Sequence, residues 1–303
     1  MKTQVTTRYL LSVAVSMIVL CAGARAGPGF FDDFRDGDPA DGSPVNWVPV
    51  WGWDATGYTL TPEGLEVAGA GAGDLDSNPY IYSDVSIRVQ IRRISNQRSG
   101  EWASGFAFRW SEGPTGGYWI EVKPPSRFWL GHRDRWRLRS ATLPFNVDEQ
   151  DLMIRVDALG DQIKGWCWPV GEPMPEDPQI SIVDDVAPEG FVSLYAWTDG
   201  GKTIFRSVQV VTPDEPAVDL NCDGKVNCLD VCTMMQQWGT NDPLCDIAPA
   251  PFGDGIVDAQ DLSVLAEHIT DGGAPLAGDI NCDGVVDFLD LAELAQNWLR
   301  QQP

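Results

Sequence analysis

The chain has 303 residues, with 44 Asp and Glu against 21 Lys and Arg, and its formal net charge is -23 at pH 7. A surface of that sign repels phosphate groups, so nucleic acid and anionic membranes are excluded as favourable partners. The acidity is strongest near the C-terminus, where residues 214–303 hold 17 acidic residues against only Lys225 and Arg300. Such a segment favours cations as partners.

The first 26 residues have the pattern of a secretory signal. Lys2 and Arg8 precede an apolar stretch over residues 10–20, which is followed by the small residues of AGARA. The stretch is shorter than the roughly 20 residues that a membrane span requires, which argues against a transmembrane anchor. We therefore predict that residues 1–26 are removed and that the protein is secreted, with an extracellular or cell-surface location.

Residues 27–210 are predicted to form an antiparallel β-sandwich. Val85, Ile87, Val89 and Ile91 alternate with polar residues in DVSIRVQIR, as in a strand with one buried face. No long helical period interrupts this region, and its length is enough for one full core. The strand period returns in GFAFRW, LMIRVDA and TIFRSVQV, and TPEG (61–64) and TDGG (198–201) are typical of hairpin turns.

Residues 211–218 are predicted to be a linker, because two prolines and two acids stand among small residues in VVTPDEPAV. Beyond it, over residues 219–303, apolar residues recur at helical spacing in three short segments, each after an acidic loop. The pattern predicts a small all-α module of repeated loop and helix. The predicted apolar faces are Val231, Met234, Met235 and Trp238; Leu262, Leu265, Ala266 and Ile269; and Leu291, Leu294, Ala295 and Trp298.

Two of the acidic loops have the ligand spacing of a calcium site. Calcium takes about six to eight oxygen ligands, and a loop of about 12 residues supplies them from positions 1, 3, 5, 7, 9 and 12, with glycine at position 6. Both DLNCDGKVNCLD and DINCDGVVDFLD fit this spacing. The predicted ligands are Asp219, Asn221, Asp223, the Lys225 carbonyl, Asn227 and Asp230 in the first loop, and Asp279, Asn281, Asp283, the Val285 carbonyl, Asp287 and Asp290 in the third.

The middle loop, CDIAPAPFGDGIVDAQD, keeps only the second half of the pattern. Asp254, the Ile256 carbonyl, Asp258 and Asp261 occupy ligand positions, but counting back along the loop puts apolar residues at positions 1 and 3. Asp246 supplies position 1 only if the APAP segment bulges out as an insertion. The alternative is a loop that is held by its prolines and apolar packing and binds no calcium.

Residues 219–298 resemble a dockerin module, whose units are an EF-hand calcium loop and one helix, because DLNCDGKVNCLD and DINCDGVVDFLD each precede a helix pattern. The resemblance implies Ca²⁺ as cofactor, a cohesin-type domain or other extracellular scaffold as partner, and a link to polysaccharide breakdown. The tail departs from the family by having three units, and by placing Cys228 and Leu229 where a polar partner-contacting pair often lies. The alternative is a structural envelope protein whose tail binds calcium but no partner.

Six cysteines follow residue 26, and five of them lie in the tail. In a secreted module this clustering favours disulfides, whose connectivity the sequence leaves open. Zinc is the alternative, although there is no CxxC pair and His132 and His268 are the chain's two histidines.

The two ends of the sandwich segment, FFDDFRDGDPADGSPVNW and GFVSLYAWTDGGKTIFRSVQV, resemble the laminin-G-like or concanavalin-like jelly roll of secreted carbohydrate-active proteins. The resemblance implies that the first strand pairs beside the last. It also implies a polysaccharide as partner.

Aromatic and cationic residues of the sandwich suggest a glycan surface. Eleven tryptophans lie between residues 47 and 197, and aromatic faces are platforms for the C–H faces of sugar rings. In HRDRWRLRS four arginines share one parity, which in a strand gives one cationic face that can grip carboxylated or sulfated glycans. The alternatives are core positions for most tryptophans and arginines paired with acids. The predicted glycan-binding residues are Trp51, Trp53, Trp129, Arg133, Arg135 and Trp136.

No catalytic motif is found in the sandwich segment. Glycoside hydrolysis needs two positioned carboxyl groups, and the E-x-D-x-x-E spacing of laminarinase-like hydrolases does not occur between residues 27 and 213, where Glu121 stands alone in YWIEV. We therefore predict glycan binding and name no catalytic residue. The alternative is a polysaccharide hydrolase or lyase with an appended dockerin.

Overall fold

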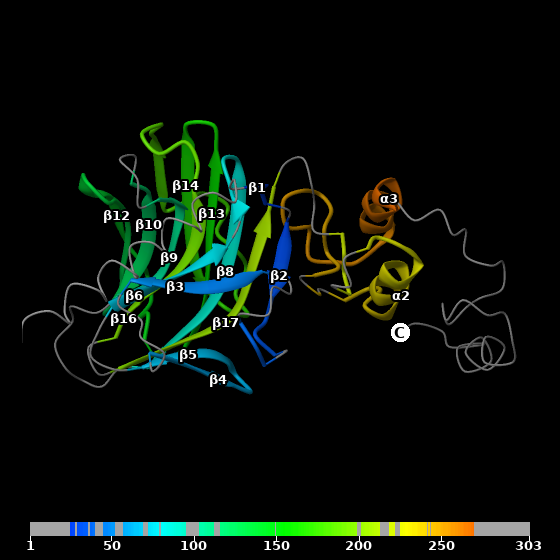
Figure 1. The fold of residues 1–303 in the computed structure, drawn as a ribbon, viewed down its shortest axis with the longest axis horizontal. Helices are drawn as coiled ribbons and strands as arrows, with labels where there is room; N and C mark the ends of the chain where they lie inside the picture. The colour runs from blue at the N-terminus through cyan, green and yellow to red at the C-terminus, as the bar shows by residue number, and fades with distance from the viewer. Residues whose placement is uncertain are drawn as a thin grey trace, which may run out of the picture.

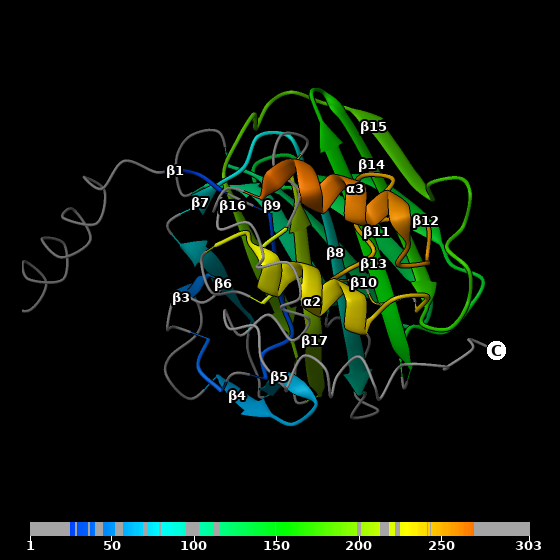
Figure 2. The ribbon, with the colours of Figure 1, turned by 90° about the vertical axis from the view of Figure 1, so that its right-hand side faces the viewer.

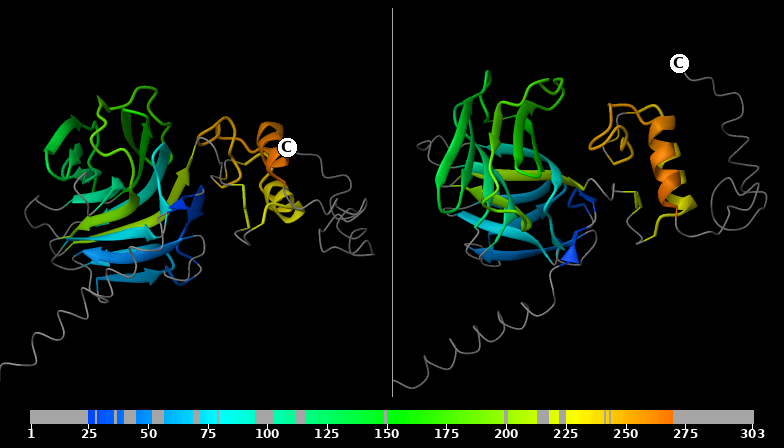
Figure 3. Two further views of the ribbon diagram at one scale, coloured as in Figure 1. Left: turned by 45° about the horizontal axis from the view of Figure 1, so that its top comes forward. Right: turned by 90° about the horizontal axis from the view of Figure 1, so that it is seen from above.

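A computed structural model describes residues 25–27, 29–35, 37–39, 45–51, 57–68, 72–78, 80–94, 103–111, 116–148, 150–198, 201–212, 218–221, 225–240, 242 and 244–269. This part of the chain consists mainly of two antiparallel sheets, which confirms the predicted mainly β fold class. The sheets lie as stacked layers, with helices beside the sandwich (Figures 1 and 3). No helix within these ranges is long and apolar enough to cross a membrane.

The first layer is a seven-stranded sheet with the order β12-β11-β10-β9-β16-β6-β3. Every neighbouring pair in it is antiparallel. Its strands are β3 (Asn46–Trp51), β6 (Ala72–Asn78), β9 (Ala103–Trp110), β10 (Tyr118–Lys123), β11 (Arg127–His132), β12 (Trp136–Thr142) and β16 (Phe191–Trp197).

The second layer is an eight-stranded sheet with the order β15-β14-β13-β8-β17-β5-β4, to which β2 (Phe30–Asp32) is added by pairing with β17. That pairing confirms that the first strand of the sandwich lies beside the last. The other strands are β4 (Tyr58–Thr61), β5 (Gly64–Ala68), β8 (Val85–Ile94), β13 (Asp151–Leu159), β14 (Gln162–Pro169), β15 (Ile180–Val183) and β17 (Lys202–Val211), while β1 (Arg25–Ala26) and β7 (Tyr80–Ile81) form a short parallel pair.

The core lies between the two layers and follows from the period-two pattern of the strands. The even alternation predicted for β8 is present, since Val85, Ile87, Val89 and Ile91 are fully buried. Phe106 and Phe108 of β9 face them from the other sheet and belong to the same core cluster. Because side chains alternate along a strand, the residues between these positions lie on the outer faces of the sandwich.

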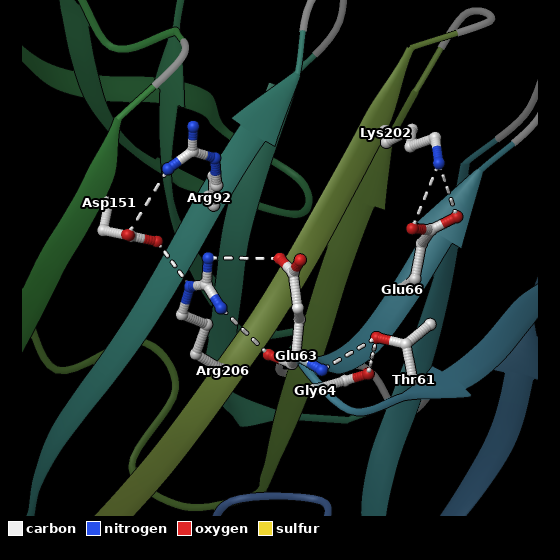
Figure 4. A network of polar contacts seen from close by, with 8 residues as sticks. All are labelled: Thr61, Glu63, Gly64, Glu66, Arg92, Asp151, Lys202 and Arg206. Carbon is white, nitrogen blue, oxygen red and sulfur yellow. Dashed lines mark hydrogen bonds and ion pairs between the residues drawn. The ribbon is translucent and has the colours of Figure 1, made fainter.

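A tight turn and ion pairs between strands stabilise the eight-stranded sheet (Figure 4). TPEG forms the β4–β5 turn, and Gly64 has a φ of +126° where a Cβ would lie 2.2 Å from the Phe205 carbonyl oxygen, so only glycine fits. Arg206 binds Asp151 at 2.5 Å on the outer face, and Lys202 binds Glu66 at 3.0 Å. Such partly exposed pairs stabilise by about 1 kcal/mol or less each.

The tail contains α2 (Cys228–Gln236) and α3 (Ala259–His268), which agree with the first two predicted helices. The third predicted helix lies outside the described residues. The predicted apolar faces are narrower than expected, because Met234 and Leu265 are fully buried while Met235 is 50% exposed. A separate small core is formed by Val218, Leu220, Met234, Cys245, Ile247, Val257 and Leu265.

The described part of the tail packs on the outer face of the eight-stranded sheet, where Figure 2 shows α2 and α3 in front of β8, β13 and β17. Phe252, in the loop before α3, is 5% exposed. Its ring lies 4.7 Å from the guanidinium carbon of Arg88 on β8 and 4.9 Å from that of Arg155 on β13. The APAPF segment therefore joins the tail to the sandwich.

Candidate functional site

A row of residues crosses the outer face of the seven-stranded sheet. In the strand registers Trp129 lies opposite Glu121, Glu121 opposite Gly105, and Gly105 opposite Tyr195. Directly opposed residues share one face of a sheet, and the chain neighbours of Trp129, Glu121 and Tyr195, with Phe106 next to Gly105, belong to the core on the other face. We call Trp129, Glu121, Gly105 and Tyr195 the outer row.

Gly105 lies in the middle of the outer row and is itself buried. A Cβ at this position would lie 1.9 Å from the carbonyl oxygen of Ile120, so no larger residue fits. Glu121 offers an acceptor on one side of it, and Tyr195 offers an aromatic face on the other.

Glu121 is the charged centre of the outer row and is 5% exposed. Burial raises the pKa of its carboxyl, and the positive charges of Lys123, Arg137 and Arg93 offset part of that rise. Lys123 Nζ lies 3.7 Å from Glu121 Oε1. Glu121 thus offers acceptor oxygens to a ligand in a partly desolvated place, where hydrogen bonds to a charged group are strong.

Cations lie against Trp129. The guanidinium carbon of Arg137 is 3.6 Å from the Trp129 ring centroid, and Lys123 Nζ is 4.7 Å from it. Lys123 also lies 5.9 Å from the ring of Trp197, which is 38% exposed. Trp119, two residues before Glu121 on β10, is half-buried and shares its parity. The outer face is therefore both aromatic and cationic.

The structure sorts the six predicted glycan-binding residues. Trp129 belongs to the outer row, and Trp51 holds the register position at the far end of the same row, opposite Asp74 of β6. Trp53 lies outside the described residues. Trp136 is 63% exposed, and its ring centroid lies 5.6 Å from that of Trp119.

The two predicted arginines are exposed and each has a contact within the chain. Arg133 donates to the carbonyl oxygen of Ser111 at 2.8 Å, and Arg135 binds Asp184 at 2.5 Å. The expectation of one cationic strand face is wrong, because residues 133–135 form a turn and β12 begins only at Trp136. A bulge between Leu130 and Gly131 further shifts the register of β12.

The sequence did not single out Lys123 or Tyr195, it indicated Arg137 only as one of four arginines on a cationic face, and it indicated Glu121 only as an isolated acid. One local signal was available: Trp119, Glu121 and Lys123 alternate with core residues in YWIEVK, which places them on one outer face. Nothing local links that face to Tyr195, which reaches the row through long-range strand pairing.

Glu121 is the acid of the outer row, and Asp74 of β6 lies in register with Tyr195. Three strand spacings separate the backbones of Glu121 and Asp74. At about 4.8 Å per spacing this is about 14 Å.

The first acidic loop is organised by Asp230, which is fully buried. Its Oδ1 accepts hydrogen bonds from Leu220 N at 2.7 Å and Asn221 N at 3.3 Å, and its Oδ2 accepts one from Asn227 N at 2.7 Å. Asn227 in turn caps α2 by accepting from Leu229 N. The acid at predicted position 12 therefore closes the loop onto its helix.

The middle loop has the same network. Fully buried Asp261 accepts from Ile247 N and Ala248 N at 2.7 Å through Oδ1, and from Asp258 N at 2.7 Å through Oδ2. Asp258 caps α3 as Asn227 caps α2. The equivalence holds although the chain between is longer in the middle loop, and the extra residues include the APAP segment.

Asp246 directly precedes Ile247, as Asp219 precedes Leu220, so the two acids begin equivalent loops. Asp246 is 4% exposed, and its two oxygens accept from Asp254 N at 3.0 Å and Gly255 N at 2.8 Å. Burial raises the pKa of its carboxyl, the backbone donors lower it, and the charges of Asp261 and Asp254 raise it further. The middle loop thus gathers negative charge.

The donor chemistry of both loops fits calcium, since Asp, Asn and carbonyl oxygens are the ligands that this hard cation takes. The fit is incomplete in the described part of the chain, where no group of three Asp, Glu, His or Cys side chains lies close enough together to hold a metal. Ala248 stands where the first loop has Asn221, and the Ile256 side chain is 54% exposed. Asp223 and the whole third loop, 279–290, lie outside the described residues, so calcium binding stays a prediction.

The predicted disulfides do not include every cysteine. Cys228 and Cys245 of the tail are free thiols, as is Cys167 of the sandwich, so pairing is wrong for these residues. Cys232 of α2 is disulfide-bonded. Cys222 and Cys282 lie outside the described residues, so the connectivity stays a prediction.

Comparison with known proteins gives no family. No protein-family model matches the sequence. No curated protein matches it either.

Many solved structures resemble the chain weakly. They include the carbohydrate binding module CBM66 from Bacillus subtilis (19% identity, 55% of this chain and 95% of that chain, TM-score 0.45) and the β-glucanase of Bacillus licheniformis (12%, 62% and 100%, TM-score 0.43). The Ca²⁺-bound exoplasmic/lumenal domain of VIP36 is another (11%, 52% and 81%, TM-score 0.41). Because these identities and TM-scores are low, we assign the two-sheet architecture from the strand pairings of this chain alone.

Proposed function

We propose that this is an extracellular glycan-binding protein whose ligand lies along the outer row of the seven-stranded sheet. The observation that carries the proposal is the register that aligns Trp129, Glu121, Gly105 and Tyr195. Aromatic faces take the C–H faces of sugars, and a carboxylate accepts hydroxyl hydrogen bonds. The described tail residues pack on the opposite sheet and leave this row to a ligand.

We further propose the division into a signal segment over 1–26, a sandwich over 27–210, a linker over 211–218 and a calcium-folded tail over 219–303. The two equivalent loop networks support the tail as a dockerin-like unit, whose partner is a cohesin-type domain or another extracellular scaffold. In this proposal the tail delivers a glycan-binding sandwich to an assembly for polysaccharide breakdown.

Bound Ca²⁺ would supply positive charge to loops in which backbone N–H groups donate to Asp230, Asp246 and Asp261. In the middle loop Asp246, Asp254, the Ile256 carbonyl, Asp258 and Asp261 would hold it. The chain's own contribution is to orient these groups through the caps of α2 and α3. A ligand that binds only the folded tail stabilises it.

Tyr195→Ala tests the glycan site, with Tyr58→Ala as its matched control. Both tyrosines are half-buried, but Tyr58 lies on β4 of the other sheet. Affinity electrophoresis against a polysaccharide panel should show a loss of roughly tenfold or more for Tyr195→Ala and little change for Tyr58→Ala. Equal losses would refute the site, and sustained release of reducing sugar would show a hydrolase or lyase instead.

Calcium and docking are tested on the full chain. Calorimetry in calcium and in EDTA should show that chelation lowers the melting temperature of the tail and leaves the sandwich transition in place. Identical melting in both buffers would refute the calcium loops. Pull-down on a panel of cohesin domains with and without EDTA then tests the partner, and retention that ignores EDTA would contradict calcium-dependent docking.

A further inference from the structure

We infer that the glycan of the outer row is anionic, and that Arg137 holds its carboxylate or sulfate group. This inference rests on the proposed glycan-binding function and adds the chemical class of the ligand. It is carried by the geometry of Arg137 against Trp129 and by the distribution of ion pairs along β11 and β12.

Arg137 is preorganised to bind an anion. Its guanidinium carbon lies 3.6 Å from the Trp129 ring centroid, so the ring occupies one face of the side chain. A guanidinium donates hydrogen bonds only from its edge, in its own plane, and a stacked guanidinium keeps that edge available. The Arg137 side chain is exposed, and its charge acts on the buried Glu121 carboxyl, with which it forms no ion pair within 4 Å among the described residues. A carboxylate or sulfate can therefore accept two parallel hydrogen bonds from it.

The neighbouring arginines show what a structural role looks like on this edge. Arg133 is bound to the Ser111 carbonyl, and Arg135 is bound to Asp184. Asp184 also accepts a hydrogen bond from Tyr118, so that ion pair is tied into the sheet. Arg133 and Arg135 contact acceptor oxygens of the chain, whereas Arg137 contacts the ring of Trp129. This difference distinguishes Arg137, as a ligand contact, from the two structural arginines.

The surrounding charge favours an anion although the whole chain is strongly acidic. Arg127 and Arg139 lie on the same two strands, and in the described part of the protein neither forms an ion pair. Glu121 is the acid of the row beside them, but it is buried and faces Lys123 at 3.7 Å. An anionic sugar unit at Arg137 thus meets positive charge on the solvent side.

Matched pairs of polysaccharides test the inference and distinguish the two anions. Polygalacturonate is compared with its methyl ester, in which the carboxylates are neutralised, and κ-carrageenan is compared with agarose, a neutral galactan. Titration calorimetry on the full chain should show at least tenfold tighter binding to one charged member than to its neutral partner. The pair that shows the difference identifies carboxylate or sulfate.

Two variants separate a specific contact from general attraction between charges. Arg137→Ala should lose that tenfold preference, and Arg137→Lys should retain only part of it, because an ammonium lacks the two-pronged donor edge. Arg133→Ala removes one positive charge from the same edge and should keep the preference. Equal losses in Arg137→Ala and Arg133→Ala would overturn the inference.

The failure of the inference differs from failure of the proposed function. If neutral and charged members bind equally and Tyr195→Ala weakens both, glycan binding stands and the anionic class is wrong. If no member of either pair binds but Tyr195→Ala weakens binding to another polysaccharide of the panel, the anionic class is wrong and glycan binding stands. If nothing in the panel binds, both are wrong.

Discussion

Replacing Asp261 by Asn tests whether the buried acids of the tail hold its loops together. Asp261 accepts three backbone N–H groups, from Ile247, Ala248 and Asp258, each at 2.7 Å. An Asn side chain keeps one acceptor oxygen and turns an NH₂ group toward a backbone donor. Losing one charge-assisted bond costs about 1.5 to 3 kcal/mol, and an unsatisfied buried donor adds about 1 to 3 kcal/mol. We expect Asp261→Asn to destabilise the tail by about 2.5 to 6 kcal/mol.

The measurement is urea denaturation of the full chain in EDTA, monitored by the far-UV circular dichroism signal of the helices. Glu267→Gln is the control, because it also neutralises one acid of α3 but lies exposed on the helix. That control should change the stability by about 0.5 kcal/mol or less, as surface substitutions do.

The comparison with calcium present separates two roles of Asp261. If the backbone network is its role, the loss appears in EDTA as well as in calcium. If Asp261→Asn behaves like Glu267→Gln in EDTA and differs only in calcium, the carboxylate acts as a metal ligand and the reasoning from hydrogen bonds is refuted.

Three further predictions follow from the structure. Phe252→Ala removes the ring between Arg88 and Arg155, and truncating a buried Phe costs about 3 to 5 kcal/mol. Limited proteolysis should therefore release the tail from the sandwich, while the melting temperature of the sandwich stays the same. An unchanged proteolysis pattern would contradict this docking contact. Burial raises the pKa of Glu121, so its ionised form is less stable than it would be in water, and Glu121→Gln should raise the melting temperature while weakening glycan binding; a lower melting temperature would show that the ionised carboxylate stabilises the sheet. Burial alone would raise the pKa of Asp184, but hydrogen bonds from Arg135, Tyr118 and a backbone N–H lower it to about 2 from an ordinary 3.8. The ionised carboxylate therefore stabilises the fold above about pH 4, and this stabilisation is lost as the pH falls toward about 2. Asp184→Asn should lack this loss of stability in acid titrations, and an acid denaturation profile identical to that of the wild type would contradict the prediction.

The elements with local signals were predictable from the sequence. The alternation in DVSIRVQIR predicted β8, since a strand at a sandwich face needs one apolar side every second residue. The apolar residues at helical spacing after each acidic loop likewise predicted α2 and α3. The narrower apolar face of α2 was not predictable, because which of two adjacent methionines packs inward depends on the neighbouring segments.

The candidate site depended on pairings between distant parts of the chain. The sequence indicated Trp129 as a sugar platform, but its alignment with Tyr195 required the registers of β11, β10, β9 and β16. The arginines show the same limit. Their equal parity suggested one cationic face, and a turn at residues 133–135 and a bulge at Leu130 assigned them different roles.

The sequence by itself determined the β period of the sandwich, the helical period of the tail and the spacing of acids in the two calcium-type loops, because each depends on residues only a few positions apart. Only the tertiary structure decided that Glu121 lies beside Gly105 and Tyr195, that Arg137 rests on Trp129 while Arg133 and Arg135 are engaged elsewhere, and that the APAP segment projects Phe252 onto the sandwich. The physical reason is that strand register and packing are set by which surfaces bury each other, and those surfaces come from segments far apart in the chain.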